Sequence, residues 1–340
     1  MSVEEGFIGD SPTIKHYIEP REYLKDVEES RREGLAGGGV SVAGGVVSGE
    51  AGSAWHAPGC SSIYCQVHKT LDPETLVVDA GPGPHTRVDI DVGEGLLPLN
   101  LELSLLDPSL RVVEFNVKGS GLLSAWVRIR GGSGRRLVLK LNLPKGRTSY
   151  IGVSEECGGY SGERAVILES SRALRVEEFI RVESSSFRVK NIVVAENGSK
   201  LDWETWGTAA GDSPLLHLHG LAVSTGGSTT ALRGVISIHK NSRRGSVVYG
   251  LDSIQLDGRS LMQPKLEVYT SEVKEARHYA RNVRFTADQL FYLSSRGLST
   301  REAYFLLLTG LAKTGVEDPE VSSLLEHAFK QILLKLGLPG

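Results

Sequence analysis

The chain has 340 residues, of which 40% are hydrophobic, 23% are charged and 40 are glycine. This balance is typical of a globular protein and excludes global disorder. The 38 basic and 41 acidic side chains leave a net charge of −3, which does not favour a nucleic-acid partner. No apolar run approaches the ~18 residues that cross a bilayer. The acidic start MSVEEGFIGD lacks the apolar segment of a secretory signal, so we expect a cytoplasmic protein without membrane contact.

Residues 1–54 are expected to form an N-terminal segment that is partly helical and partly glycine-rich. Pro20 suits the first turn of a helix through REYLKDVEESRREGL, with Leu24 and Val27 on one face. The stretch GLAGGGVSVAGGVVSGEAGSAW that follows cannot sustain a helix. It is either a flexible linker or a set of tight turns between short strands. The interleaved valines favour the strands; they are Val40, Val42, Val46 and Val47.

Residues 55–284 are predicted to form a β-rich core without helices. Short β-branched runs recur, and several alternate apolar and polar residues with the period of a half-buried strand. Examples are LRVVEFNV at 110–117, RLVLKLNL at 136–143 and LRGVISIH at 232–239. Short strands without intervening helices indicate a sandwich, a jelly roll or a β-solenoid, and the residues alone leave that choice open.

Residues 285–340 change to the period of helices and are predicted to form a separate C-terminal helical unit. Two capping boxes and one Asp-Pro start signal open three helices. These signals are Thr286-Ala-Asp-Gln289, Ser299-Thr-Arg-Glu302 and Asp318-Pro319.

A longer signature crosses this junction. It consists of Pro264-Lys-Leu-Glu267-Val-Tyr, then His278, then Asp288-Gln289-Leu-Phe-Tyr-Leu-Ser-Ser-Arg296-Gly297-Leu298, preceded by Arg233-Gly234-Val-Ile-Ser-Ile. It resembles the C-terminal signature of the SufB/SufD family, the scaffold subunits of the SUF iron–sulfur cluster assembly machinery. In that family, P-x-L-E-[IV] precedes a histidine, which lies eleven residues before the glutamine of D/E-Q-L-F-Y-L-x-S-R-G-[IL]. The resemblance covers roughly residues 230–311.

The resemblance implies a mainly β fold, a right-handed parallel β-helix with N- and C-terminal helical segments. It also implies partners: a SufC-type ABC ATPase that docks on residues 285–340, and a SufB-type subunit or a second copy of this chain as a homodimer. In the family, a nascent iron–sulfur cluster is thought to be held where two β-helix subunits meet. A transient cluster is therefore expected here, with no tightly bound cofactor.

His278 aligns with the family histidine and is the candidate cluster ligand. The SufB cysteine would follow Glu267, where this chain has Val268, and the glutamates beside the SufB histidine are Arg277 and Tyr279 here. The resemblance is therefore SufD-like at this position, or the chain is a divergent relative that has lost cluster assembly. Arg277 is expected to favour a nearby anionic cluster.

Three cysteines are too few for a disulfide framework but are candidate metal ligands. Cys60 and Cys65 lie close to His68, and thiolates with imidazole suit iron, zinc or a cluster. On a strand, however, Cys65 and His68 would face opposite ways, so buried cysteines beside a surface histidine are the alternative. Cys157, in EECGGY, is weakly similar to a SufB cysteine in a Glu-Gly-Cys turn, or is a free thiol.

His217 and His219 would lie on one face of a strand, as a metal-chelating or an ordinary surface pair. Trp203 and Trp206 are expected to be packing aromatics. No G-x-x-x-x-G-K-[ST] loop occurs, so any ATPase activity must come from a partner.

The sequence thus predicts a non-catalytic scaffold subunit. Two alternatives remain: a secreted-type β-helix carbohydrate-active enzyme with carboxylates on one solenoid face, and a purely structural partner subunit that binds no cluster.

Overall fold

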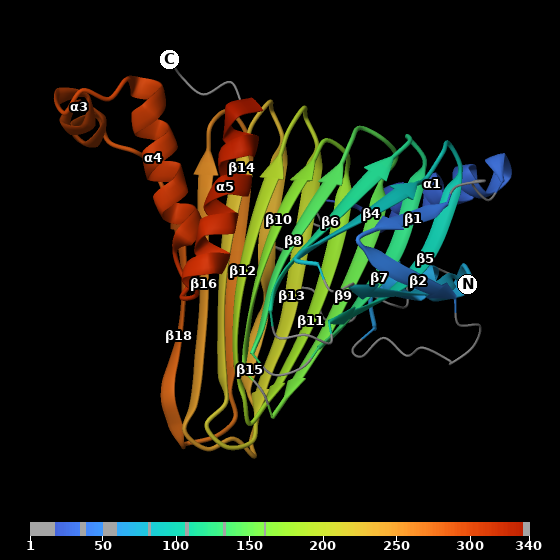
Figure 1. The fold of residues 1–340 in the computed structure, drawn as a ribbon, viewed down its shortest axis with the longest axis horizontal. Helices are drawn as coiled ribbons and strands as arrows, with labels where there is room; N and C mark the ends of the chain where they lie inside the picture. Colours follow the sequence, from blue (N-terminus) through green and yellow to red (C-terminus); the bar gives the residue numbers. More distant parts are fainter. Residues whose placement is uncertain are drawn as a thin grey trace.

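The computed structural model describes residues 18–34, 39–49, 60–80, 83–105, 109–131, 134–159 and 161–335. Over these ranges the chain forms two nine-stranded sheets with helices at both ends (Figure 1). Expectations for residues 1–17, 35–38 and 50–59 lie outside the described residues.

We name each sheet after its last strand. The β18 sheet consists, in spatial order, of β1 (Val40–Ala43), β4 (His85–Asp91), β6 (Leu110–Lys118), β8 (Arg135–Leu143), β10 (Gly162–Ser170), β12 (Ser186–Ala195), β14 (Leu215–Ser224), β16 (Gly245–Gln255) and β18 (Val273–Asn282). The β17 sheet consists of β2 (Gly45–Gly49), β3 (Glu74–Ala80), β5 (Leu96–Leu105), β7 (Leu122–Gly131), β9 (Ser149–Gly158), β11 (Leu174–Glu183), β13 (Lys200–Ala210), β15 (Thr229–Ile238) and β17 (Arg259–Val268).

From β3 onward the chain alternates between the two sheets, and neighbours within each sheet are parallel. Each turn therefore adds one strand to each sheet, which is a parallel β-solenoid. The alternating leucines of β8 illustrate the sequence pattern behind this fold. Leu137, Leu139 and Leu143 point into the core between the sheets, while Val138 faces outward. The predicted mainly β, parallel β-helical fold with terminal helices is confirmed.

The glycine-rich stretch begins the solenoid with two short antiparallel strands. β1 pairs with β4 and β2 with β3. Gly44 joins them at φ +80°, and a Cβ there would lie 2.4 Å from the carbonyl oxygen of His85. The expectation of turns between short strands is thus confirmed for the described part of this stretch.

Two helices lie on the outer face of the β17 sheet. In α1 (Pro20–Glu33), Tyr23 and Val27 are buried. The second helix, α2 (Ile63–Thr70), contradicts the prediction that residues 55–284 contain no helix. Its eight residues include the β-branched Ile63 and Val67, which favour strands, so the sequence does not indicate a helix clearly. Ser62 nevertheless supplies an N-cap.

Three C-terminal helices begin at the predicted caps. They are α3 (Ala287–Ser295), α4 (Thr300–Lys313) and α5 (Pro319–Lys335). Leu308 of α4 and Phe329 of α5 share one apolar cluster with outward-facing Ile167 and Leu221 of the β18 sheet. In contrast, α3 buries no residue and projects away from the solenoid (Figure 1). Among the described residues, no helix is long and apolar enough to cross a membrane.

The solenoid interior contains a buried chain of charges. The guanidinium of Arg164 lies 3.0 Å from an Oε2 of Glu155 and also pairs with Glu178, while Arg135 pairs with Glu155. Glu178 in addition accepts hydrogen bonds from Asn191, Trp203 and Thr205. Because two cations face two anions, the buried charges compensate each other.

We expect Glu178→Ala to lower the free energy of unfolding by about 3–5 kcal/mol, because it leaves a buried arginine without its anion. Urea denaturation measures the change. Glu183→Ala on the same strand is the matched control, because Glu183 forms an exposed ion pair with Arg181 and should change stability by less than about 1 kcal/mol. Equal losses in the two variants would contradict this account of the core.

Candidate functional site

The C-terminal end of the solenoid is an open rung formed by β17 and β18, which we call the terminal rung. In the described part of the chain, β17 pairs only with β15 and β18 only with β16. Each strand therefore presents one row of backbone N–H and C=O groups without a strand partner. Pro264 lies in β17, as is usual for an edge strand. The end of β17 also carries two exposed apolar side chains, Val268 (44%) and Tyr269 (60%).

His278 faces the mouth of the solenoid from β18. It pairs with Tyr249 of β16, whose side chain is buried in the core between the sheets. Parallel partners point to the same side, so His278 is directed inward. Its side chain is nevertheless exposed, because no further rung covers it within the described residues. An accessible imidazole at this place can act as a ligand to a metal or a cluster.

Val268 is the counterpart on β17. It pairs with Ile238, which is also buried in the core, so it too faces inward. The strands β17 and β18 contact each other across the end of the solenoid. The position where SufB would have a cysteine therefore lies on the same rung as His278, but an aliphatic side chain cannot ligate iron.

The neighbours of His278 face the other way. Arg277 pairs with Glu275 at 3.0 Å, and the hydroxyl of Tyr279 lies 3.1 Å from Nδ1 of His219. These contacts are on the outer face of the β18 sheet. This geometry does not favour the expected assistance of Arg277 to a cluster beside His278, because successive residues of a strand point to opposite faces.

His217 and His219 do share a face, as predicted, but each has its own partner. Nε2 of His217 lies 2.9 Å from the hydroxyl of Ser246, and His219 contacts Tyr279. The backbone at Gly315 packs so closely on the His219 ring that a Cβ would lie 2.2 Å from it. This burial lowers the pKa of His219 to about 4. The described residues contain no group of three or more His, Cys, Asp or Glu side chains that could hold a metal ion.

Cys60 and Cys65 form a disulfide, and Cys65 lies in α2 rather than on a strand. His68 is buried between Ser124 and Asn100, which lie 2.9 Å from its two ring nitrogens. The alternative of a surface histidine is therefore wrong, since the helix turns His68 toward the sheet. The three side chains do not converge on a metal site, and their role as ligands stays a prediction.

Cys157 is a buried cysteine in β9 that forms no disulfide, and its Sγ lies 3.8 Å from Nη2 of Arg135. It faces the solenoid interior with Glu155. Its strand lies four places from β17 in the same sheet, so the structure does not bring Cys157 and His278 together.

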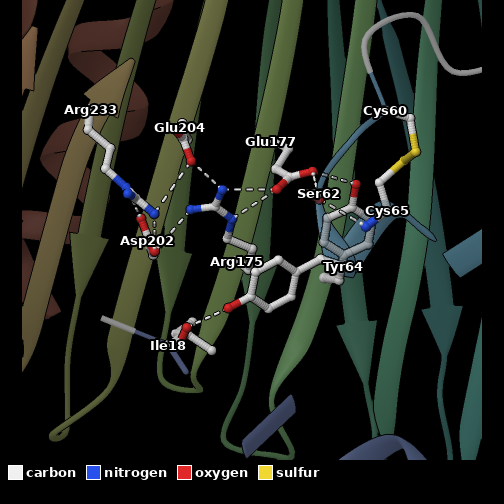
Figure 2. Close-up of polar contacts among 11 residues, drawn as sticks. Ile18, Cys60, Ser62, Tyr64, Cys65, Arg175, Glu177, Asp202, Glu204 and Arg233 are labelled. Atoms are coloured by element: carbon white, nitrogen blue, oxygen red, sulfur yellow. Dashed lines mark hydrogen bonds and ion pairs between the residues drawn. A yellow bond between two sulfur atoms is a disulfide. The ribbon is translucent and has the colours of Figure 1, made fainter. Parts of the chain in front are cut away.

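A charged network that was not predicted from the sequence lies on the outer face of the β17 sheet (Figure 2). Arg233, which the signature contains, pairs with Asp202 through two contacts of 3.0 Å. Asp202 also lies 3.0 Å from Arg175, which in turn lies 2.9 Å from Glu177. The sequence does contain a signal for this network: charged residues recur at alternate positions of 174–183 and 200–206. On strands within a sheet, such residues would need partners of opposite charge if they were buried.

The partly buried His219 predicts an acid-sensitive fold. Its pKa is lower in the folded than in the unfolded chain, so the unfolded state binds more protons between pH 6.5 and about 4. The stabilisation is complete above pH 6.5 and is lost as the pH falls toward 4. The natural chain should lose free energy of unfolding between pH 7.5 and 4.5, and we expect this loss to be about 2 kcal/mol smaller in His219→Phe.

Urea denaturation at the two pH values measures this loss. Tyr279→Phe is the matched control: it removes the hydroxyl but retains the partly buried imidazole, so its acid sensitivity should match that of the natural chain. An unchanged pH dependence in His219→Phe would show that other groups determine the acid sensitivity.

The described residues define a β-solenoid protein in which both sheets end on ten-residue strands at the terminal rung. Residues 169–311 match the protein family described as SUF system FeS cluster assembly, SufBD core domain. The chain is also 32% identical over 117 residues to the iron-sulfur cluster assembly SufBD family protein ycf24 of Galdieria sulphuraria; this covers 34% of the chain and 52% of that protein. The chain thus spans about half the length of this relative.

This match of residues 169–311 to the SufBD core domain confirms the resemblance seen in the sequence. The matched residues include the terminal rung and His278 and leave out all three cysteines.

Proposed function

We propose that this chain is a scaffold subunit for iron–sulfur cluster assembly in the cytoplasm, and that it is SufD-like at the ligand position. One observation carries the proposal: His278, inside the matched domain, faces inward from an open rung and remains accessible. The cluster is cargo and is held only transiently. Val268 supports the SufD-like assignment, because this rung offers an imidazole and no thiolate.

The open edges of β17 and β18 support a second β-solenoid as the partner. A partner strand added to each edge would satisfy the unpaired backbone groups and extend both sheets across the junction. His278 would then lie at the junction, beside ligands that the partner supplies. A SufB-type subunit would contribute a cysteine there, whereas a second copy of this chain would contribute only another His278.

We expect His278→Ala to reduce the yield of cluster by about tenfold or more in a complex reconstituted anaerobically with a SufB-type subunit and a SufC-type ATPase. Visible absorption measures the yield, and gel filtration checks that the complex remains intact. Arg277→Ala is the matched control, because this neighbour points to the outer face and should leave the yield unchanged.

If His278→Ala assembles normally and forms as much cluster as the natural chain, His278 is structural. The chain is then a supporting subunit that binds no cluster, which is the alternative left open by the sequence.

The helix α3 is the proposed docking element for the SufC-type ATPase. It buries none of its residues, and Phe291 and Tyr292 are exposed by 76% and 56%. Exposed aromatic side chains on a projecting helix are typical anchors of protein interfaces. By comparison, α4 and α5 use their apolar faces to cover the β18 sheet.

We expect the double variant Phe291→Ser, Tyr292→Ser to weaken ATPase binding by about tenfold or more, as measured by titration calorimetry. Leu334→Ser is the control, because Leu334 is comparably exposed on α5. These substitutions are sharper than deletion of residues 285–340, since the deletion would uncover the apolar outer face of the β18 sheet. Undiminished binding by the double variant would place the docking surface elsewhere.

A further inference from the structure

The disulfide between Cys60 and Cys65 encloses the N-cap of α2 (Figure 2). Ser62 lies between the two cysteines and makes two hydrogen bonds. Its Oγ accepts from the backbone N–H of Cys65 at 3.1 Å and donates to Oε2 of Glu177 at 2.7 Å. The covalent loop therefore holds the start of α2 over a buried carboxylate of β11.

The rest of α2 covers polar groups that also depend on it. The hydroxyl of Tyr64 donates to the carbonyl of Ile18 at 2.5 Å, and the Tyr64 ring lies 5.2 Å from the guanidinium carbon of Arg175. His68 fills the space between Ser124 and Asn100. Lifting α2 would thus expose Arg175 and leave Glu177 without one of its donors.

That donor matters because the charges beneath α2 are unbalanced. Two guanidinium groups face three carboxylates in the network. The members of the network are Arg175, Arg233, Glu177, Asp202 and Glu204. Neutral donors to Glu177, which are the hydroxyls of Ser62 and Tyr150, stabilise the excess negative charge.

We propose that Cys60–Cys65 is a reversible redox site whose oxidised form fastens α2 to the β17 sheet. Cys60 is partly exposed and Cys65 is buried, so a thiolate reductant reaches Sγ of Cys60 first. This attack forms a mixed disulfide and breaks the bond to Cys65, which leaves as a thiolate in the first turn of α2, where helix N–H groups favour a negative charge.

A second thiol then displaces Cys60 from the mixed disulfide. In total the reductant becomes a disulfide and the chain gains two electrons and two protons. The chemical class of the co-reactant is therefore a dithiol, or two molecules of a monothiol. The inference concerns the N-terminal cover and stands independently of the proposed function of the terminal rung.

The test is hydrogen exchange of the full chain with and without dithiothreitol, followed by mass spectrometry of the peptide that covers residues 61–71. The disulfide closes a short loop and so restricts the conformations of α2 when it detaches from the sheet. Because this restriction is moderate for a short loop, reduction should speed exchange in this peptide by a factor on the order of 10 to 50. Exchange in β12 should not change, and removal of the reductant with reoxidation should restore protection.

Three variants sharpen the result. Cys60→Ser with Cys65→Ser should exchange quickly in either condition, while Cys157→Ser should behave as the natural chain. Ser62→Ala should speed exchange even when the disulfide is closed. Alkylation in denaturant counts the thiols that are not in a disulfide: one is expected without reductant and three after reduction.

Several outcomes overturn the inference. Three alkylated thiols in protein kept under air and then alkylated in denaturant without reductant would show that no disulfide forms. A disulfide that opens without any change in exchange of residues 61–71 would show that it does not fasten α2. An equal rise of exchange in β12 would show that reduction loosens the whole chain rather than this cover.

Discussion

Every buried backbone N–H and C=O group needs a hydrogen-bond partner, and this constraint determines the architecture of the chain. A solenoid satisfies the need by pairing each strand with the strand one turn earlier, which transfers the problem to its two ends. At the N-terminal end, each sheet ends with a short antiparallel strand of four or five residues. At the C-terminal end, each sheet ends with a strand of ten residues that is parallel to its neighbour. Short edge strands offer few backbone groups for pairing with a strand of another chain, whereas ten-residue edge strands offer many. The terminal rung is therefore the end at which a partner strand is expected, and it is also where His278 lies.

Helices cover the outer faces of both sheets, and the two covers are built differently. On the β18 sheet the contact with α4 and α5 centres on one hydrophobic cluster, with polar contacts such as Lys190 to Leu311 and Lys335 to Glu169 around it. On the β17 sheet, α1 and α2 combine aromatic packing with hydrogen bonds to buried charges, and a disulfide fixes the start of α2. The first contact is sensitive to acid through His219, which packs under Gly315, while the second depends on the state of Cys60 and Cys65. Among the helices in the described part of the chain, α3 alone buries no residue, which is why it is the proposed docking element.

Much of this architecture could be predicted from local patterns, because strand alternation and helix caps are local. The three C-terminal helices begin at Thr286, Ser299 and Asp318 as their caps indicate. The inward direction of His278 required its pairing with Tyr249, which no local pattern supplies. Alternation alone would have placed Arg277 on the opposite face. The helix α2 was missed because eight residues with two β-branched side chains carry little periodicity, and the disulfide was missed because it depends on that helix.

The central claim is that the terminal rung is the working end of this protein. Hydrogen exchange of the chain alone and mixed with a purified SufB-type subunit tests it most directly, because added strand pairing protects backbone amides. The account predicts new protection across β17 and β18, centred on the residues around Val268 and His278, with no change in β1 and β2. Protection confined to the N-terminal strands, or a stable complex in which β17 and β18 exchange as fast as in the free chain, would contradict it.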